Sequence, residues 1–187
     1  GWYMVQSGLT ERTDVSHYRL SLHLIIAFLI LIFLFWNFLD LSVKDTAPKK
    51  KIPLNFTIIF LALLLIQIVT GAFVSGLDAG QIYQTWPLMN QTYFPDDAKI
   101  NDLLSLNAFE IPSIVQFIHR NIAYFIIILF SFIAFVIYKN KDLIYLRKVT
   151  LLVLVILSFQ TILGILTILS GAQIFLASMH QIGSIFL

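Results

Sequence analysis

The chain contains no cysteine, and its 187 residues include only 12 lysine and arginine and 10 aspartate and glutamate residues. Without thiols, neither a disulfide framework nor a thiolate metal site can form. Charged residues make up 12% of the chain and hydrophobic residues 59%, whereas soluble domains average about 25% and about 45–50%. The composition excludes an ordinary soluble domain, gives no reason to expect a nucleic-acid partner, and predicts an all-α polytopic membrane protein.

Apolar runs divide the chain into membrane spans, each of which needs about 20 residues. We expect full spans at 17–39, 52–74, 112–138 and 149–169. A shorter run follows at 174–187, and an outer loop at 75–111 separates the second span from the third. The apolar patch at the start of the chain and the short last run indicate a helix cut at each end. We therefore expect a piece of a longer protein.

Basic residues gather on two of the predicted loops. The loops at 40–51 and 139–148 hold eight of the 12 lysine and arginine residues, and the opposite side holds seven of the 10 acidic residues. Basic residues on short loops mark the cytoplasmic or matrix face. Both loops are therefore predicted on that face, in a bacterial cytoplasmic membrane or the mitochondrial inner membrane.

Three histidines share one depth in the predicted helices. His23, His119 and His180 each lie about seven to nine residues inside the outer end of a run, which is ~10–13 Å at the helical rise. Ionisable side chains inside a membrane helix are costly and are rarely placed there without a partner. Independent core histidines would have no reason to share a level, so we interpret these three as a functional set. His17, at a helix end, is predicted to be a solvated interface residue.

An internal repeat accompanies the histidines. Two glycine pairs with seven-residue spacing each precede a histidine: Gly1 and Gly8 before His23, and Gly164 and Gly171 before His180. Such duplication is common in membrane proteins that place sites between repeats. We expect residues 1–51 to be the remnant of an N-terminal four-helix half, and 52–187 to form an antiparallel four-helix bundle as the C-terminal half. Glycines 71, 76 and 80 are expected to allow close helix packing.

Facing imidazoles favour haem over the other chemistries that histidines support. Two neutral imidazoles across a helical bundle can hold haem iron on both axial positions. Zinc prefers four ligands, often thiolate or carboxylate, and histidine proton relays usually include buried acids. No aspartate or glutamate lies at the histidine depth. Arg120, beside His119, and Arg19, one turn before His23, are placed to pair with haem propionates.

Six segments together resemble one known family. They are GWYMVQSGL (1–9), VSHYRLSLHL (15–24), GAFVSGLDAG (71–80), TWPLM (85–89), QFIHR (116–120) and the closing His180-Gln181. In this order, and over essentially the whole chain, they resemble haem A synthase in the cysteine-free form of mitochondria and many Gram-negative bacteria. The chain would cover roughly the C-terminal two-thirds of such a protein.

The resemblance implies an oxidoreductase with eight helices in two pseudo-symmetric halves. Such an enzyme oxidises the C8 methyl of haem O to a formyl group and so supplies haem A to terminal oxidases. The implied substrate is haem O and the implied cofactor is haem b, in a lipid bilayer. The electron donor, haem O synthase as a partner, and the oligomeric state are left open.

The resemblance also assigns roles to residues of the second half. It implies that His119 and His180 are the axial ligands of a haem b, with Arg120 and Gln116 beside it. Gln116 stands three residues before His119, where the family's first-half motif carries a glutamate implicated in catalysis. A neutral amide suits an electron-transfer haem better than a proton-handling site.

In the first half, the resemblance assigns His23 as an axial ligand of the substrate haem, with Arg19 nearby. The catalytic glutamate would lie upstream of Gly1, so the isolated piece is expected to be inactive. Two alternatives stay open. One is a diheme b-type electron-transfer cytochrome without haem-modifying activity, and the other is a transporter or structural membrane protein without haem.

Overall fold

The computed structural model describes residues 2–6, 15–42 and 52–187, and these residues form an all-α polytopic membrane protein. Within this part of the chain the only β pairing is an isolated bridge between Met89 and Thr92. The first glycine pair of the predicted repeat, Gly1 and Gly8, and most of the basic loop at 40–51 lie outside the described residues.

The described chain contains four helices that are long and apolar enough to span a membrane. They are α2 (His17–Ser42), α3 (Leu54–Gly76), α5 (Pro112–Lys139) and α6 (Arg147–Leu169). The shorter elements are α1 (Trp2–Val5), η1 (Ala79–Gln81), α4 (Ile100–Leu103), η2 (Leu106–Glu110), η3 (Lys141–Leu146), α7 (Ile174–Gly183) and η4 (Ser184–Phe186). The membrane helices begin within two residues of the predicted spans and end at most three residues beyond them.

Proline and glycine mark several helix ends. Proline lies at the first position of α5 and immediately before α3, where its fixed φ suits a helix start and its missing N–H costs no hydrogen bond. Gly171 adopts φ +71° in the turn between α6 and α7, a conformation that side chains with a Cβ disfavour. This turn brings α7 back along α6.

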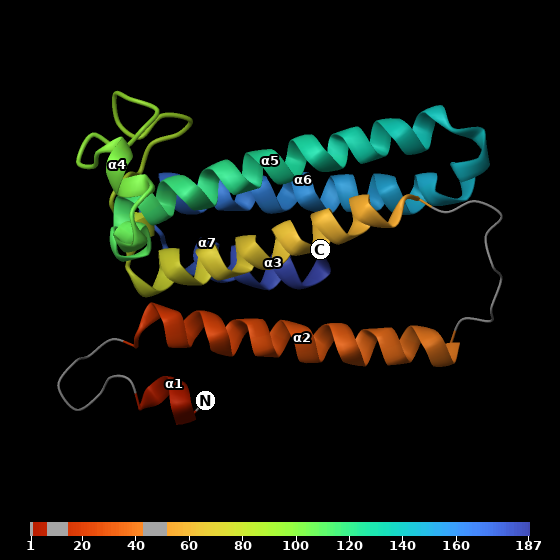
Figure 1. Cartoon of the computed structure of the whole chain (residues 1–187), viewed down its shortest axis with the longest axis horizontal. Coiled ribbons are helices and arrows are strands. Elements are labelled where there is room, and N and C mark those ends of the chain that lie inside the picture. The colour runs from red at the N-terminus through yellow and green to blue at the C-terminus, as the bar shows by residue number, and fades with distance from the viewer. Residues whose placement is uncertain (1, 7–14, 43–51) are drawn as a thin grey trace.

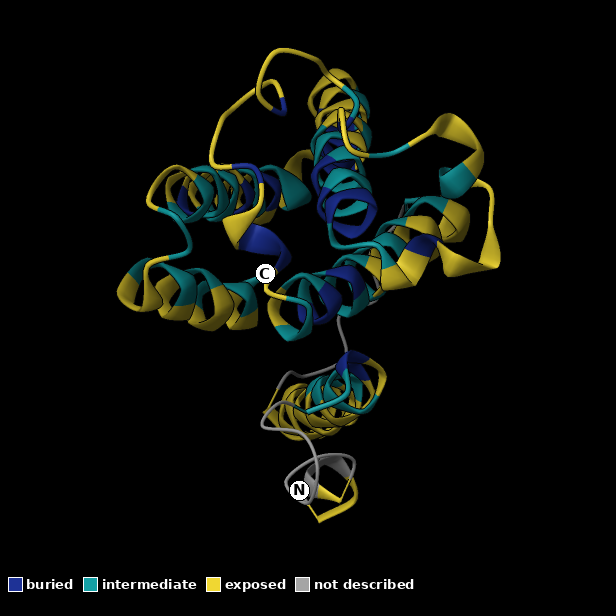
Figure 2. Cartoon of the chain, turned by 90° about the vertical axis from the view of Figure 1, so that its left-hand side faces the viewer, coloured by how far each residue is buried: buried dark blue, intermediate teal, exposed yellow. Residues whose placement is uncertain are grey.

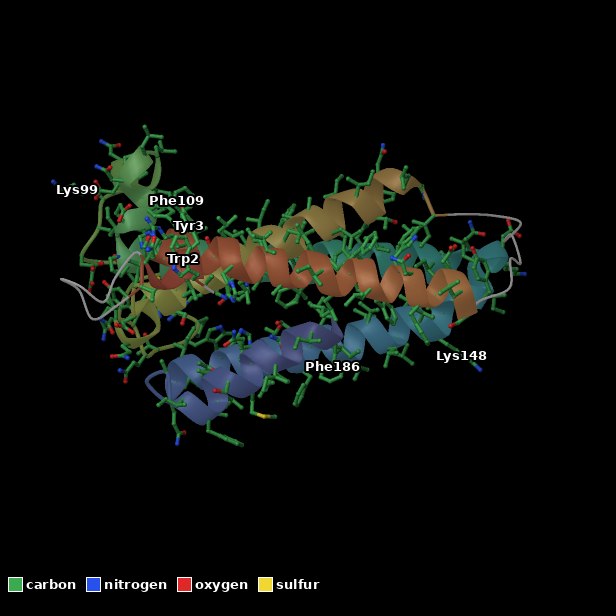
Figure 3. All side chains as sticks on the ribbon, turned by 90° about the horizontal axis from the view of Figure 1, so that it is seen from below. Trp2, Tyr3, Lys99, Phe109, Lys148 and Phe186 are labelled. Carbon is green, nitrogen blue, oxygen red and sulfur yellow. The ribbon has the colours of Figure 1, made fainter. Side chains whose placement is uncertain are left out.

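The connection from Leu77 to Ile111 and the turn at η3 lie at opposite ends of the bundle (Figure 1). We call the end that carries the connection the outer end. Lys99 lies at this outer end and Lys148 at the other (Figure 3). The chain therefore presents two well-separated polar ends joined by apolar helices, which is the arrangement expected of a multi-pass membrane protein.

Helix α3 packs against α5, α5 against α6, and α6 against α7. The largest buried cluster is apolar and consists of Ile126, Phe130, Ile133, Ile137, Leu143 and Leu157. Because α5 runs inward from Pro112, this cluster fills the half of the bundle away from the outer end. The outer half contains buried polar side chains, including Thr70, Gln116 and Arg120, alongside apolar ones such as Ile114 and Val115.

Helix α2 lies to one side of the other membrane helices, with α1 beyond it (Figure 2). It contacts α3, and Phe33, Trp36 and Leu41 on it are strongly exposed. No residue of its most apolar window is buried by the described chain. Lipid or other protein is the environment that such a surface requires.

Candidate functional site

His119 projects from the outer half of α5 onto the backbone of α3. A Cβ added to Gly71 would lie 3.1 Å from His119 Cε1, so the ring packs tightly against the glycine and a side chain there would crowd it. Nδ1 of His119 lies 3.0 Å from Thr70 Oγ1, and Nε2 lies 3.2 Å from Gln67 Nε2. Both ring nitrogens are thus in contact with polar atoms of α3.

His180 packs in the same way on α6. We call the glycine against which each ring packs, Gly71 for His119 and Gly164 for His180, its seat. A Cβ added to Gly164 would lie 2.9 Å from His180 Cε1. Nδ1 of His180 lies 3.1 Å from the backbone oxygen of Gln160, and Gln160 Nε2 donates to the backbone oxygen of His180 at 2.6 Å. The imidazole therefore rests on exposed helix backbone, which an alanine side chain at position 164 would cover.

The two seats share a sequence pattern that sequence reasoning missed. Each has a glutamine four residues before the seating glycine, at Gln67–Gly71 and Gln160–Gly164. A spacing of four residues places both positions on one helix face, a turn apart. The repetition of this spacing on two helices was the available signal. Gly71 was expected only to bring helices close, and it specifically accommodates His119.

This arrangement suits imidazoles that bind a metal through Nε2. Metal-ligating histidines generally donate Nδ1–H to an oxygen acceptor, which fixes the tautomer and the ring orientation. His119 has Thr70 Oγ1 at that position and His180 has the Gln160 carbonyl. The two histidines lie on helices of one packed bundle, in which α3 packs against α5, α5 against α6 and α6 against α7. The ligation of one iron by these two residues stays a prediction.

The donor atoms that the chain offers fit a metal ion that a cofactor already coordinates. Among the described residues, no group of three or more histidine, cysteine, aspartate or glutamate side chains could hold a metal ion. A porphyrin supplies four nitrogen donors, so two imidazoles complete the coordination of haem iron. Gln67 Oε1 and Gln160 Oε1 are buried without a hydrogen-bond partner in the described chain. The residues present thus fit a bis-histidine haem.

Arg120 and Gln116 hold the outer connection on α5. Arg120 Nη2 donates to the Tyr83 carbonyl at 2.8 Å and Nη1 to the Thr85 carbonyl at 2.9 Å. Gln116 Nε2 donates to the same Tyr83 carbonyl at 3.0 Å. These loop carbonyls, rather than a carboxylate, are the partners that the structure gives Arg120. The predicted pairing of Arg120 with a propionate stays a prediction.

Further contacts attach this connection along α5. Trp86 Nε1 donates to Tyr124 Oη at 2.8 Å, and Tyr93 Oη donates to the amide oxygen of Asn121. Tyr83 is 2% exposed, and its hydroxyl donates to the carboxylates of Asp96 and Asp97. Burial, followed by these two hydrogen bonds, raises the pKa of Tyr83 well above its ordinary value. The phenol therefore stays neutral, as a donor to both carboxylates must.

The structure places His23 and Arg19 apart from the two seated histidines. His23 lies on an exposed part of α2. Arg19 donates from Nη1 to the Tyr3 carbonyl at 3.0 Å, and its guanidinium lies 4.4 Å from the centre of the Tyr3 ring. The roles predicted for both residues stay predictions.

The expectation that His17 is solvated is wrong. Its side chain is buried, and its ring meets Phe73 edge-on at 5.1 Å. A Cβ added to Gly76 would lie 2.7 Å from the Cβ of His17. Beside it, a half-open cavity of about 220 Å³ reaches Tyr18 and Glu110. The position of His17 at a helix end did not predict that it packs against Gly76 of α3.

Comparison with known proteins adds relatives of similar sequence. A protein named heme A synthase from Pelagibacter ubique (strain HTCC1062) is 46% identical over 185 residues, which cover 99% of this chain and 54% of that protein. The heme A synthases of Wolbachia pipientis wMel and Flavobacterium johnsoniae are each 40% identical and cover 100% of the chain, which aligns with 52% and 56% of their lengths.

The chain thus spans about half the length of the curated relatives it matches. No solved structure matches it. A family model described as cytochrome oxidase assembly protein matches residues 1–187. The chain belongs to this family, the COX15-CtaA family of cytochrome oxidase assembly proteins.

Proposed function

We propose that the chain is part of a haem A synthase, a membrane oxidoreductase that converts the C8 methyl of haem O to the formyl group of haem A. The observation that carries the proposal is the pair of seated imidazoles, His119 on Gly71 and His180 on Gly164. The family relationship and the names of the relatives support the same function.

In this proposal His119 and His180 hold a haem b through Nε2, and Thr70 and the Gln160 carbonyl anchor Nδ1 of each ring. When bound, the haem supplies one-electron transfer to and from the substrate side. The chain's own residues hold the imidazoles at a fixed separation and orientation. Arg120 and Gln116 keep the outer connection on α5, next to His119.

The proposed substrate site is built around His23, with Arg19 near it. His23 lies on an exposed part of α2. Because the chain spans about half the length of its relatives, we propose that the rest of the protein completes this site and supplies the catalytic glutamate, so this chain alone is expected to be inactive. Candidate partners are an electron donor, haem O synthase and further copies of the protein.

The proposal also includes the orientation in the membrane. The loops at 40–51 and 139–148 face the cytoplasm or matrix because they carry most of the lysine and arginine residues. The seated histidines then lie in the outer half of the bilayer. The membrane is the bacterial cytoplasmic membrane or its mitochondrial counterpart, the inner membrane.

Extraction of haems from a host that makes haem O but lacks its own haem A synthase tests this function. Expression of the full-length protein should produce haem A, and His119→Ala should abolish both haem A and the b-type spectrum. His23→Ala should abolish haem A while the haem b remains, because His23 lies apart from the two seats. A full complement of haem b with no haem A from the unsubstituted protein would favour the electron-transfer cytochrome instead.

A further inference from the structure

We propose that Thr70 is a positioning residue that orients His119 and lowers the redox potential of the haem held there, an inference that rests on the proposed function. The hydroxyl of Thr70 lies 3.0 Å from His119 Nδ1. Thr70 is 3% exposed, so the contact is shielded from solvent. Neither the family relationship nor the sequence motifs assign a role to this residue.

In the tautomer that we propose, Nδ1–H of His119 donates and Thr70 Oγ1 accepts. Thr70 Oγ1 donates its own hydrogen to the backbone oxygen of Gln67 at 3.1 Å. With that hydrogen used, Oγ1 is left to accept from Nδ1–H of His119. This tautomer leaves the lone pair on Nε2, which is the nitrogen that must be free to bind iron.

The amide of Gln67 is the group that responds to ligation. Gln67 Nε2 lies 3.2 Å from His119 Nε2, where it donates to the lone pair in the tautomer described above. Its Oε1 is buried without a hydrogen-bond partner in the described chain. When iron takes Nε2, this amide must turn away, whereas the contact from Nδ1 to Thr70 persists. Thr70 thus fixes the ring orientation before and after ligation.

The two seats differ in the chemistry of their acceptors. His180 Nδ1 faces the backbone carbonyl of Gln160, which side-chain substitution cannot remove. His119 Nδ1 faces a hydroxyl, which substitution by valine removes at nearly constant volume. The Thr70 contact is therefore the part of the two seats that can be tested directly.

A hydrogen bond from Nδ1–H increases the basicity of the imidazole as a ligand. A more basic ligand stabilises ferric over ferrous iron and lowers the reduction potential. Removing the acceptor should do the opposite. We expect Thr70→Val to shift the one-electron equilibrium up to about tenfold toward the reduced form, which is a rise of ~59 mV.

Redox titration of the purified full-length protein tests the proposal, with Thr70→Ser and Thr150→Val as controls. Thr150 is a matched control because it is 4% exposed, and its Oγ1 donates to the Leu146 carbonyl at 2.9 Å, far from either histidine. The potential should rise in Thr70→Val and remain unchanged in Thr70→Ser and Thr150→Val. Loss of haem from Thr70→Val alone, with both controls loaded at unchanged potential, also supports the positioning role.

Three outcomes overturn the proposal in distinguishable ways. An unchanged potential in haem-loaded Thr70→Val shows that the hydroxyl does not act on the iron. An equal rise in Thr70→Ser, or in Thr150→Val, shows that packing or global stability is the cause. Absence of a low-spin b-type haem from the unsubstituted protein contradicts the proposed function itself, and with it the role of Thr70.

Discussion

At the scale of single residues, the absence of a Cβ at two positions decides where the imidazoles lie. Gly71 and Gly164 sit one helical turn after a glutamine, and a ring packs on each. Each ring approaches the glycine through Cε1 and has a polar partner at Nδ1. Such a ligand is pre-organised, and this reduces the entropy lost when a metal binds.

Gly164→Ala should displace the His180 ring, because the new Cβ would lie 2.9 Å from its Cε1. Overpacking of this kind typically costs about 1–3 kcal/mol. We expect lower haem b occupancy and a lower melting temperature, measured by the ratio of Soret to protein absorbance and by thermal unfolding in detergent.

Gly80→Ala is the control for this substitution. Its added Cβ would lie 3.3 Å from the Cβ of Ala172 and next to no histidine. It should leave the haem b content unchanged. Equal haem loss in the two variants, or full occupancy in Gly164→Ala, would show that the glycine does not act as a seat.

The sequence singled out the histidines but not the residues that contact them, and their shared depth stays a prediction. The histidines and the QFIHR segment could be picked out from the sequence because ionisable groups are rare in membrane helices. The contacts of Thr70, Gln67 and Gln160 depend on how helices rotate against each other, which no single run specifies. His17 was misjudged for the same reason, since its burial depends on Gly76 of another helix.

At the scale of elements, the connection from Ile82 to Asp97 is fastened to one face of α5. Gln116, Arg120 and Tyr124 lie at four-residue spacing, and each contacts this connection. Four residues are close to one helical turn, so the three form a stripe along α5. The stripe holds the connection over the outer end of the helix that carries His119.

Arg120→Gln should loosen this connection, because two charge-assisted hydrogen bonds to the Tyr83 and Thr85 carbonyls are lost. Hydrogen bonds to charged groups contribute about 1.5–3 kcal/mol each. Limited proteolysis should therefore cut between residues 82 and 97 several-fold faster, while most of the b-type spectrum remains.

The control here is Arg19→Gln, which removes an arginine bound to the Tyr3 carbonyl on α1. It should leave cleavage of the connection unchanged. If Arg120→Gln instead loses the haem while the connection stays resistant, the role of Arg120 is to pair with a propionate, as the sequence suggested.

The number and approximate bounds of the membrane helices were predictable, because long apolar runs bounded by proline, glycine and charge have few alternative structures in a membrane. The all-α polytopic fold and the family resemblance are confirmed. The short elements α4 and η2 were not predicted within the outer loop. Their residues show no long periodic pattern. Their positions follow from the packing of η2 against α5 and of α4 against η2.

At the scale of the whole molecule, an apolar cluster fills the inner half of the bundle, and its packing stabilises that half. In the outer half, buried polar side chains such as Thr70, Gln116 and Arg120 lie among buried apolar ones. The seated imidazoles lie in this mixed outer half. The division into an N-terminal and a C-terminal half stays a prediction.

The orientation can be measured with single cysteines, because the chain has none of its own. Lys99 and Lys148 lie at opposite ends of the molecule (Figure 3). A membrane-impermeant maleimide added to intact cells or spheroplasts should label Lys99→Cys but not Lys148→Cys. Labelling of Lys148→Cys should require permeabilised membranes, and the reverse pattern would contradict the proposed sidedness.

The central claim is that His119 and His180 ligate one haem iron from opposite sides, and ligand rescue tests it most directly. Low-temperature electron paramagnetic resonance of the ferric full-length protein should show a low-spin bis-imidazole signal assigned to haem b. His119→Gly and His180→Gly should each lose that signal and regain it when imidazole is added, whereas His23→Gly should retain it throughout. Retention of the unaltered signal in His119→Gly or His180→Gly without imidazole would contradict the account.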